Sequence, residues 1–140
     1  YIGGTKVGAL CGEALVFTRG GAPANMLSLV KQHGALLAKG WLVGLQFDTL
    51  FTDNLYLDIA HNAVRQAERL SRALVEKGYE LVSPTLSNQI FLRLSPVQLE
   101  HLSAITTFST WEQHADCTIV RLATSWATTD EQIDELIQAL

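Results

Sequence analysis

The sequence has few charges, few cysteines and no long apolar run. Charged residues are 17% of the 140 positions, against about 25% in a typical soluble domain. The longest candidate for a membrane span, residues 42–50, is broken by Gly44, Gln46 and Asp48 and stays far short of the ~18 residues that a spanning helix needs. Apolar residues are nevertheless 48% of the chain. The chain can therefore bury a core and is not a disordered segment.

The cysteines and the net charge narrow the function classes further. Cys11 and Cys117 lie far apart and neither belongs to a CxxC pair, so we expect no metal site and no redox motif. Both thiols are expected to be buried and reduced in a cytoplasmic protein. The chain opens without a charged and apolar leader, so we expect no signal peptide. A net charge of −4 disfavours a nucleic-acid partner.

Residues 55–140 follow the order helix, strand, strand, helix, strand, helix. Apolar residues at spacings of three and four predict a helix over 55–77, and Gly78 ends it. Strands are expected at 79–82, 89–94 and 117–123. Capping boxes that begin at Ser95 and Thr129 predict helices to about 104 and to 140. This order predicts an α+β domain with a small, mostly antiparallel sheet under helices.

Residues 1–54 have a different character. A short apolar run at 14–18 suits a buried strand. The stretch 35–51 is apolar on all sides and interrupted by glycines, so it is expected to face a partner surface rather than water. We therefore interpret 1–54 as the end of another domain.

Lys6 is the first candidate for chemistry. Glycines at positions 3, 4 and 8 frame it, and an apolar run follows. A lysine held in a partly dry pocket is a better nucleophile and can form a Schiff base with a carbonyl. A solvated loop lysine is the alternative, and composition alone favours it.

Arg121 is the second candidate. Strand alternation places it on the same face as Cys117, Ile119 and Ala123. A guanidinium among apolar neighbours needs a partner, and its planar fork suits the carboxylate of an amino acid. An internal salt bridge or a place on an edge strand is the alternative.

Two segments carry a resemblance to a known family. They are Gly3-Gly4-Thr5-Lys6-Val7-Gly8 with Cys11-Gly12-Glu13-Ala14 after it, and Val120-Arg121-Leu122-Ala123-Thr124-Ser125-Trp126. The first resembles the pyridoxal-phosphate lysine segment of the low-specificity L-threonine aldolases, in the β-eliminating lyase family of the aspartate-aminotransferase fold type. The second resembles part of that family's C-terminal domain. With similar stretches at 31–35, 38–41 and 87–91, the resemblance covers essentially the whole chain.

The resemblance implies a fold and a domain division. The fold is an α/β, pyridoxal-phosphate-dependent transferase-like fold, here with its α+β C-terminal portion. Residues 1–54 would end the cofactor-binding large domain, and residues 55–140 would form the small C-terminal domain. The N-terminal large domain would be missing from these residues, so they should be inactive alone.

The resemblance also implies roles for five residues. Lys6 would be catalytic and would bind pyridoxal 5′-phosphate (PLP) as a Schiff base. Thr5 and Lys39 would contact the cofactor, and Arg121 and Lys31 the substrate. A turn residue is the alternative for Thr5. A solvated lysine is the alternative for Lys31 and for Lys39.

The implied activity is the cleavage of L-threonine or L-allo-threonine to glycine and acetaldehyde, by a homodimer or homotetramer in the cytoplasm. Its partner is a small amino acid, with no nucleic acid and no membrane. One alternative is another enzyme of the same fold, an aromatic amino-acid β-eliminating lyase or an aminotransferase. A second alternative is a non-enzymatic α+β interaction module, for which Lys6 would be an ordinary surface residue.

Overall fold

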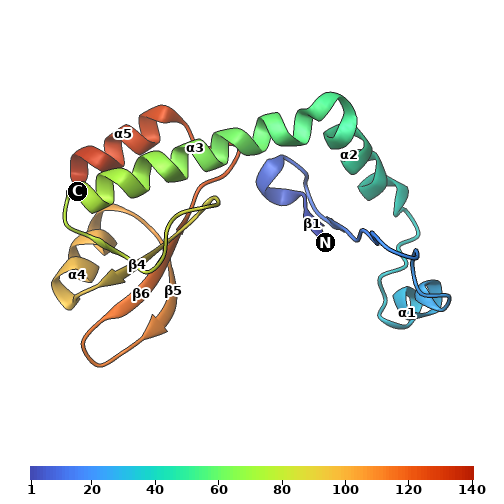
Figure 1. Cartoon of the computed structure of the whole chain (residues 1–140), viewed down its shortest axis with the longest axis horizontal. Coiled ribbons are helices and arrows are strands. Elements are labelled where there is room, and N and C mark those ends of the chain that lie inside the picture. Colours follow the sequence, from blue (N-terminus) through green and yellow to red (C-terminus); the bar gives the residue numbers. More distant parts are fainter. The chain divides into compact units, whose positions relative to one another are not determined.

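The computed structural model describes residues 1–140, which form two compact units (Figure 1). The first unit is Tyr1–Asp58 and the second is Ile59–Leu140. The division falls within helix α3 (Leu55–Glu76). The functional domain assignment drawn from the sequence, with its boundary after residue 54, stays a prediction. Each unit is described by itself.

The first unit is built from short elements. Strand β1 (Ile2–Gly3) pairs antiparallel with β2 (Glu13–Ala14), and the 3-10 helix η1 (Thr5–Val7) lies in the loop between them. Helices α1 (Met26–Gln32) and α2 (Trp41–Phe51) follow, and η2 (Thr52–Asn54) leads into α3. The unit buries three apolar side chains, those of Val7, Phe47 and Leu50.

The buried strand predicted over 14–18 is wrong. Strand β2 ends at Ala14, and the side chains of Leu15, Val16 and Phe17 are exposed. A strand needs hydrogen-bonding neighbours to be buried, and β1 offers only two residues for pairing.

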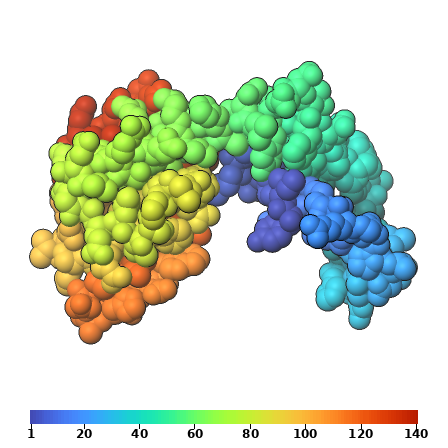
Figure 2. Space-filling view, in the orientation of Figure 1, coloured from blue at the N-terminus to red at the C-terminus, as the bar shows by residue number.

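Helices α1 and α2 leave many apolar side chains uncovered. On the face shown in Figure 2, both helices lie at the surface of the unit. The exposed apolar side chains of this region are Leu27, Leu29, Leu36, Leu37, Trp41, Leu42, Leu45 and Phe51. The apolar stretch that the sequence analysis expects to face a partner is therefore exposed in the single chain. No helix combines the length and the apolar composition required to cross a membrane.

The second unit is an antiparallel sheet covered by helices on one face. The strand order is β3-β4-β6-β5, from Glu80–Leu81, Gln89–Leu94, Thr118–Ala123 and Ser109–Gln113 respectively. Helices α3, α4 (Pro96–Ile105) and α5 (Asp130–Ala139) meet one face of this sheet. The core collects fully or nearly fully buried side chains from these helices and strands: Ala67, Leu70, Leu74, Ile90, Leu92, Leu94, Leu102, Val120, Leu122 and Ile133.

Most of the elements predicted for this unit are confirmed. The helix over 55–77 corresponds to α3, and its predicted apolar face contains the buried residues Ala63, Ala67 and Leu70. Both capping boxes form, at Ser95 and at Thr129, and they begin α4 and α5. Strand β5 is missing from the prediction because its five residues are all exposed and carry no apolar alternation.

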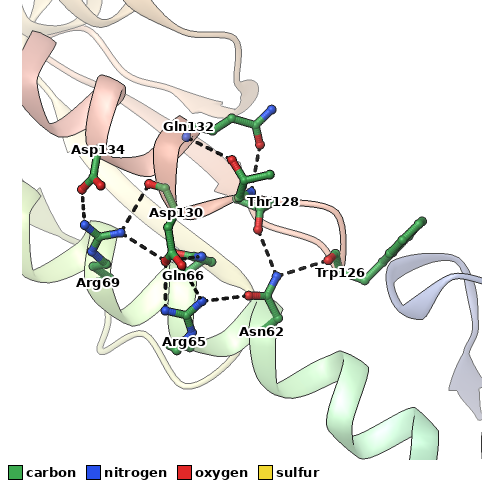
Figure 3. Close-up of polar contacts among 10 residues, drawn as sticks. Asn62, Arg65, Gln66, Arg69, Trp126, Thr128, Asp130, Gln132 and Asp134 are labelled. Carbon is green, nitrogen blue, oxygen red and sulfur yellow. Dashed lines mark hydrogen bonds and ion pairs between the residues drawn. The ribbon is translucent and has the colours of Figure 1, made fainter.

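Polar contacts join α3 to α5 (Figure 3). Arg65 donates to the Asp130 carboxylate at 2.9 Å, and Arg69 pairs with both Asp130 and Asp134. The hydrogen bond from Arg65, followed by one from Gln66, holds the pKa of Asp130 below its usual range. These contacts fix the start of α5 against α3.

Candidate functional site

Lys6 lies at the centre of a loop held by backbone contacts. It is the middle residue of η1, and the Gly4 carbonyl accepts hydrogen bonds from the N–H groups of Val7 and Ala9, both at 3.0 Å. Val7 is 4% exposed, so it anchors the turn from the inside. Lys6 itself is exposed.

The loop is packed so closely that two of its glycines leave no room for a side chain. A Cβ on Gly4 would lie 2.8 Å from Ala9 Cβ and 3.1 Å from Phe47 Cζ. Gly12 has φ +97°, and a Cβ there would lie 2.5 Å from Val43 Cγ1. These contacts explain why glycine stands on both sides of the lysine turn, and they hold the backbone of the turn against α2.

Two longer contacts fasten the same loop. The Leu10 N–H donates to Gln46 Oε1 at 2.7 Å, and the Tyr56 hydroxyl donates to the Gly3 carbonyl at 3.0 Å. Tyr56 is in turn stacked on Phe51, with ring centroids 5.1 Å apart. The backbone that carries Lys6 is therefore tied to α2 and to the start of α3.

The other predicted residues of the first unit do not gather around Lys6. Thr5 is its exposed neighbour in η1. Lys31 lies in the last turn of α1 and Lys39 in the turn before α2, and both are exposed. Figure 1 shows η1 and α1 well apart within the unit. The structure thus brings Thr5 beside Lys6, and it does not bring Lys31 there.

Arg121 belongs to the second unit, in the middle of β6. It is paired with Phe91 of β4 on one side and with Ser109 of β5 on the other. Val120 and Leu122 point into the core. Arg121 therefore lies on the sheet face away from the helices, as strand alternation predicts.

The guanidinium of Arg121 lacks the partners that a half-buried cation usually has. None of the ion pairs of the chain includes it, so the internal salt bridge considered above is absent. Its Nε is buried and has no hydrogen-bond partner. Its Cζ lies 5.3 Å from the centroid of the Trp111 ring. A cation in this position can still accept an anionic ligand through its N–H donors.

The sequence reasoning missed Trp111 and Phe91. Their rings meet edge to face, with centroids 5.3 Å apart and an interplanar angle of 78°. Phe91 lies on the other face of β4 from the buried Ile90 and Leu92. Strand alternation in the sequence could therefore have placed Phe91 on the same sheet face as Arg121. Trp111 follows no such pattern, because it lies where the pairing of β5 with β6 shifts register.

The cysteines differ from the expectation that both are buried. Cys11 is exposed, and Cys117 is partly buried. Cys117 accepts a hydrogen bond from Arg93 Nη1 at 3.3 Å, and that bond, followed by Coulomb attraction to Cys117 and Glu80, raises the pKa of Arg93. In the loop before Cys11, the buried residues are Gly4 and Val7, and Cys11 itself lies at the surface.

A cavity of about 430 Å³ lies elsewhere in the second unit. Its walls come from α5, β6 and the segment after α4, including Thr106, Leu122, Thr128, Gln132 and Leu136. It contains none of the predicted site residues.

The comparisons with known proteins agree with the two motifs. No family model matches the chain. It is 30% identical over 136 residues to the low specificity L-threonine aldolase of Pseudomonas aeruginosa. The matched region covers 96% of this chain and 38% of that protein. The structure of the Leishmania major threonine aldolase matches with a TM-score of 0.76 and 35% identity, over 83% of this chain and 34% of that one.

The chain is homologous to the low-specificity L-threonine aldolases. It spans a little over a third of the length of the aldolase relatives it matches. Its fold is that of the C-terminal region of fold type I PLP enzymes, with helices on an antiparallel four-stranded sheet. The 8-amino-7-oxononanoate synthase of Francisella tularensis shares this fold, with a TM-score of 0.61 at 16% identity, over 82% of this chain and 36% of that one. The threonine aldolase family depends on PLP.

Proposed function

We propose that this chain is part of a PLP-dependent lyase that cleaves L-threonine and L-allo-threonine to glycine and acetaldehyde. The observation that carries the proposal is the similarity to threonine aldolases, which extends over 96% of the chain in sequence and 83% in structure. Because the chain covers only part of those relatives, the activity is proposed for the complete protein. Residues outside this chain would supply the rest of the cofactor pocket.

Lys6 is the residue that would hold the cofactor. When bound, PLP withdraws electrons from Cα of the amino acid, which is what cleavage of the Cα–Cβ bond requires. The Lys6 amine takes part in none of the ion pairs and is free to react. Because Lys6 is exposed in this chain, the dry pocket that a Schiff-base lysine needs would have to be completed by residues outside it. The closely packed turn around Gly4 keeps the backbone of Lys6 in place. The hydroxyl of Thr5 would contact the cofactor phosphate, and the amine of Lys39 would contact the phosphate bound by a neighbouring subunit.

Arg121 would bind the carboxylate of the substrate, and Lys31 would contact the substrate from its own subunit or from a neighbour. A planar guanidinium with unpaired N–H donors is suited to a carboxylate. The unpartnered Nε and the absence of an ion pair at Arg121 support this role.

The complete protein is further proposed to be a homodimer or homotetramer in the cytoplasm. The exposed apolar side chains of α1 and α2 support self-association. An uncovered apolar surface of this kind is costly in water and is typical of an interface.

The experiment that tests the proposal is borohydride reduction of the complete protein, followed by peptide mass spectrometry. We expect a pyridoxyl-phosphate adduct on the peptide that contains Lys6, and its loss in Lys6→Ala. Lys77→Ala removes an exposed lysine that has no proposed role, so it should keep the adduct. Cleavage assays on threonine, allo-threonine and tyrosine then identify the reaction, because an aldolase releases glycine and an aldehyde whereas a β-eliminating lyase releases ammonia and pyruvate.

Two results would contradict the proposal. An adduct on another lysine would remove Lys6 from the site. The absence of any adduct in the complete protein would favour a non-enzymatic interaction module.

A further inference from the structure

The proposed function assigns no role to the aromatic residues around Arg121, Trp111 and Phe91. Trp111 is 54% exposed, and its ring still has two defined contacts. The Phe91 ring contacts it edge to face at 5.3 Å, and the Arg121 guanidinium lies over its face at 5.3 Å. Three side chains from three neighbouring strands thus form one cluster on the open face of the sheet.

The backbone directs Trp111 into this cluster. Thr110 pairs with Val120 and Glu112 pairs with Ile119, so Trp111 is an additional residue in β5, a β-bulge. A bulge changes the direction of a side chain relative to a regular strand. Edge strands are where such bulges are common, and β5 is an edge strand.

The contact with Trp111 restricts Arg121 without using its donors. A ring face attracts a cation through its π electrons and takes none of its N–H groups. The buried Nε has no hydrogen-bond partner, so the N–H donors of the guanidinium remain available for a carboxylate.

We propose that Trp111 is a positioning residue, whose ring, packed against Phe91, orients the Arg121 guanidinium toward the carboxylate of the amino-acid substrate. This inference rests on the proposed role of Arg121. A long arginine side chain has many rotamers, and restricting them before binding lowers the entropy lost when the carboxylate is bound.

The test compares three variants of the complete, PLP-loaded protein. Trp111→Leu removes the ring and is expected to raise KM for threonine about three- to tenfold, the effect of one lost cation–π contact, with kcat little changed. Trp111→Phe keeps a ring and should restore most of the affinity. Arg121→Gln removes the charge itself and should raise KM by more than about 30-fold.

A spectroscopic readout is independent of turnover. The Trp111 ring should shift the NMR resonance of the Arg121 Nε proton, and Trp111→Leu should return this resonance toward its ordinary position. If Trp111→Leu is too unstable, Trp111→Met serves instead, because it is long and apolar but has no ring.

The outcomes separate the two claims. An unchanged KM and an unchanged Nε resonance in the ring-free variant, with Arg121→Gln strongly impaired, would overturn the role of Trp111 and leave the proposed function intact. Normal substrate affinity in Arg121→Gln, or no amino-acid cleavage by the complete protein, would overturn both.

Discussion

At the scale of single residues, the packing of the lysine turn requires a residue without a Cβ atom at position 4. Gly4 is buried, and the side chains of Ala9 and Phe47 occupy the space that a Cβ at this position would need. Gly3 is its neighbour in sequence, yet a Cβ on Gly3 would meet nothing within 4 Å. The two adjacent glycines therefore have different physical reasons to be there.

This difference predicts opposite results for two substitutions. Gly4→Ala forces a shift of backbone or core and should lower the free energy of unfolding by about 1–3 kcal/mol, as overpacked sites do. Gly3→Ala is the matched control and should change stability little. Urea denaturation of both variants measures the effect, and equal stabilities would show that the loop is not packed as described.

At the scale of elements, the polar contacts between α5 and α3 centre on Asp130, beside the apolar packing of Ile133 into the shared core. Its carboxylate pairs with Arg65 and Arg69, and the side chains of Arg65 and Asp130 are 46% and 51% exposed. Exposed pairs of this kind are weakened by salt. The contact therefore stabilises the start of the helix through a charge that can be removed by pH or screened.

Asp130→Asn should destabilise the protein in a pH-dependent way. Hydrogen bonds from Arg65 and Gln66 place the pKa of the folded Asp130 below its ordinary value. The stabilisation is therefore complete above the unfolded pKa of about 3.9 and is lost as pH falls through the lower folded value. Thermal melts should show a lower midpoint for Asp130→Asn at pH 7, with the difference from wild type narrowing below about pH 4.

Glu131→Gln is the control for this prediction. Glu131 is the next residue of the same helix, it is exposed, and no ion pair includes it. Its removal tests the general effect of a negative charge in the first turn. A difference between Asp130→Asn and wild type that stays constant from pH 7 to 3 would show that the ion pairs are not its source.

At the scale of the whole molecule, the two units differ in how well they cover their apolar residues. The second unit buries ten or more apolar side chains in one continuous core, whereas the first buries Val7, Phe47 and Leu50. Helix α2 keeps Trp41, Leu42 and Leu45 exposed. This asymmetry is expected if the surface of the first unit is covered in an assembly.

A charge placed on that surface should disrupt the proposed oligomer. Leu45 is 53% exposed in the single chain, so Leu45→Glu costs little unless another surface packs against it. We expect analytical ultracentrifugation to give a smaller mass for Leu45→Glu than for the unaltered complete protein. Val97→Glu alters a side chain that is 76% exposed on α4 and should leave the mass unchanged. The same mass for all three proteins would place the interface elsewhere.

The sequence by itself determined the elements whose signals are local. The period of α3, the capping boxes at Ser95 and Thr129 and the alternation of β6 act between residues a few positions apart. These elements could therefore be predicted, and so could the sheet face on which Arg121 lies. The motif around Lys6 could also be recognised from the sequence, because its glycines are close together in the chain.

Only the tertiary structure decided what depends on distant neighbours. The run after Ala14 is exposed because no strand lies beside it, and β5 is a strand only because β6 supplies its hydrogen bonds. The placement of Trp111 over Arg121 follows from a bulge, which is a mismatch between two strands and leaves no trace in either sequence alone. Burial and pairing are properties of the neighbours, and a residue's own sequence context does not contain them.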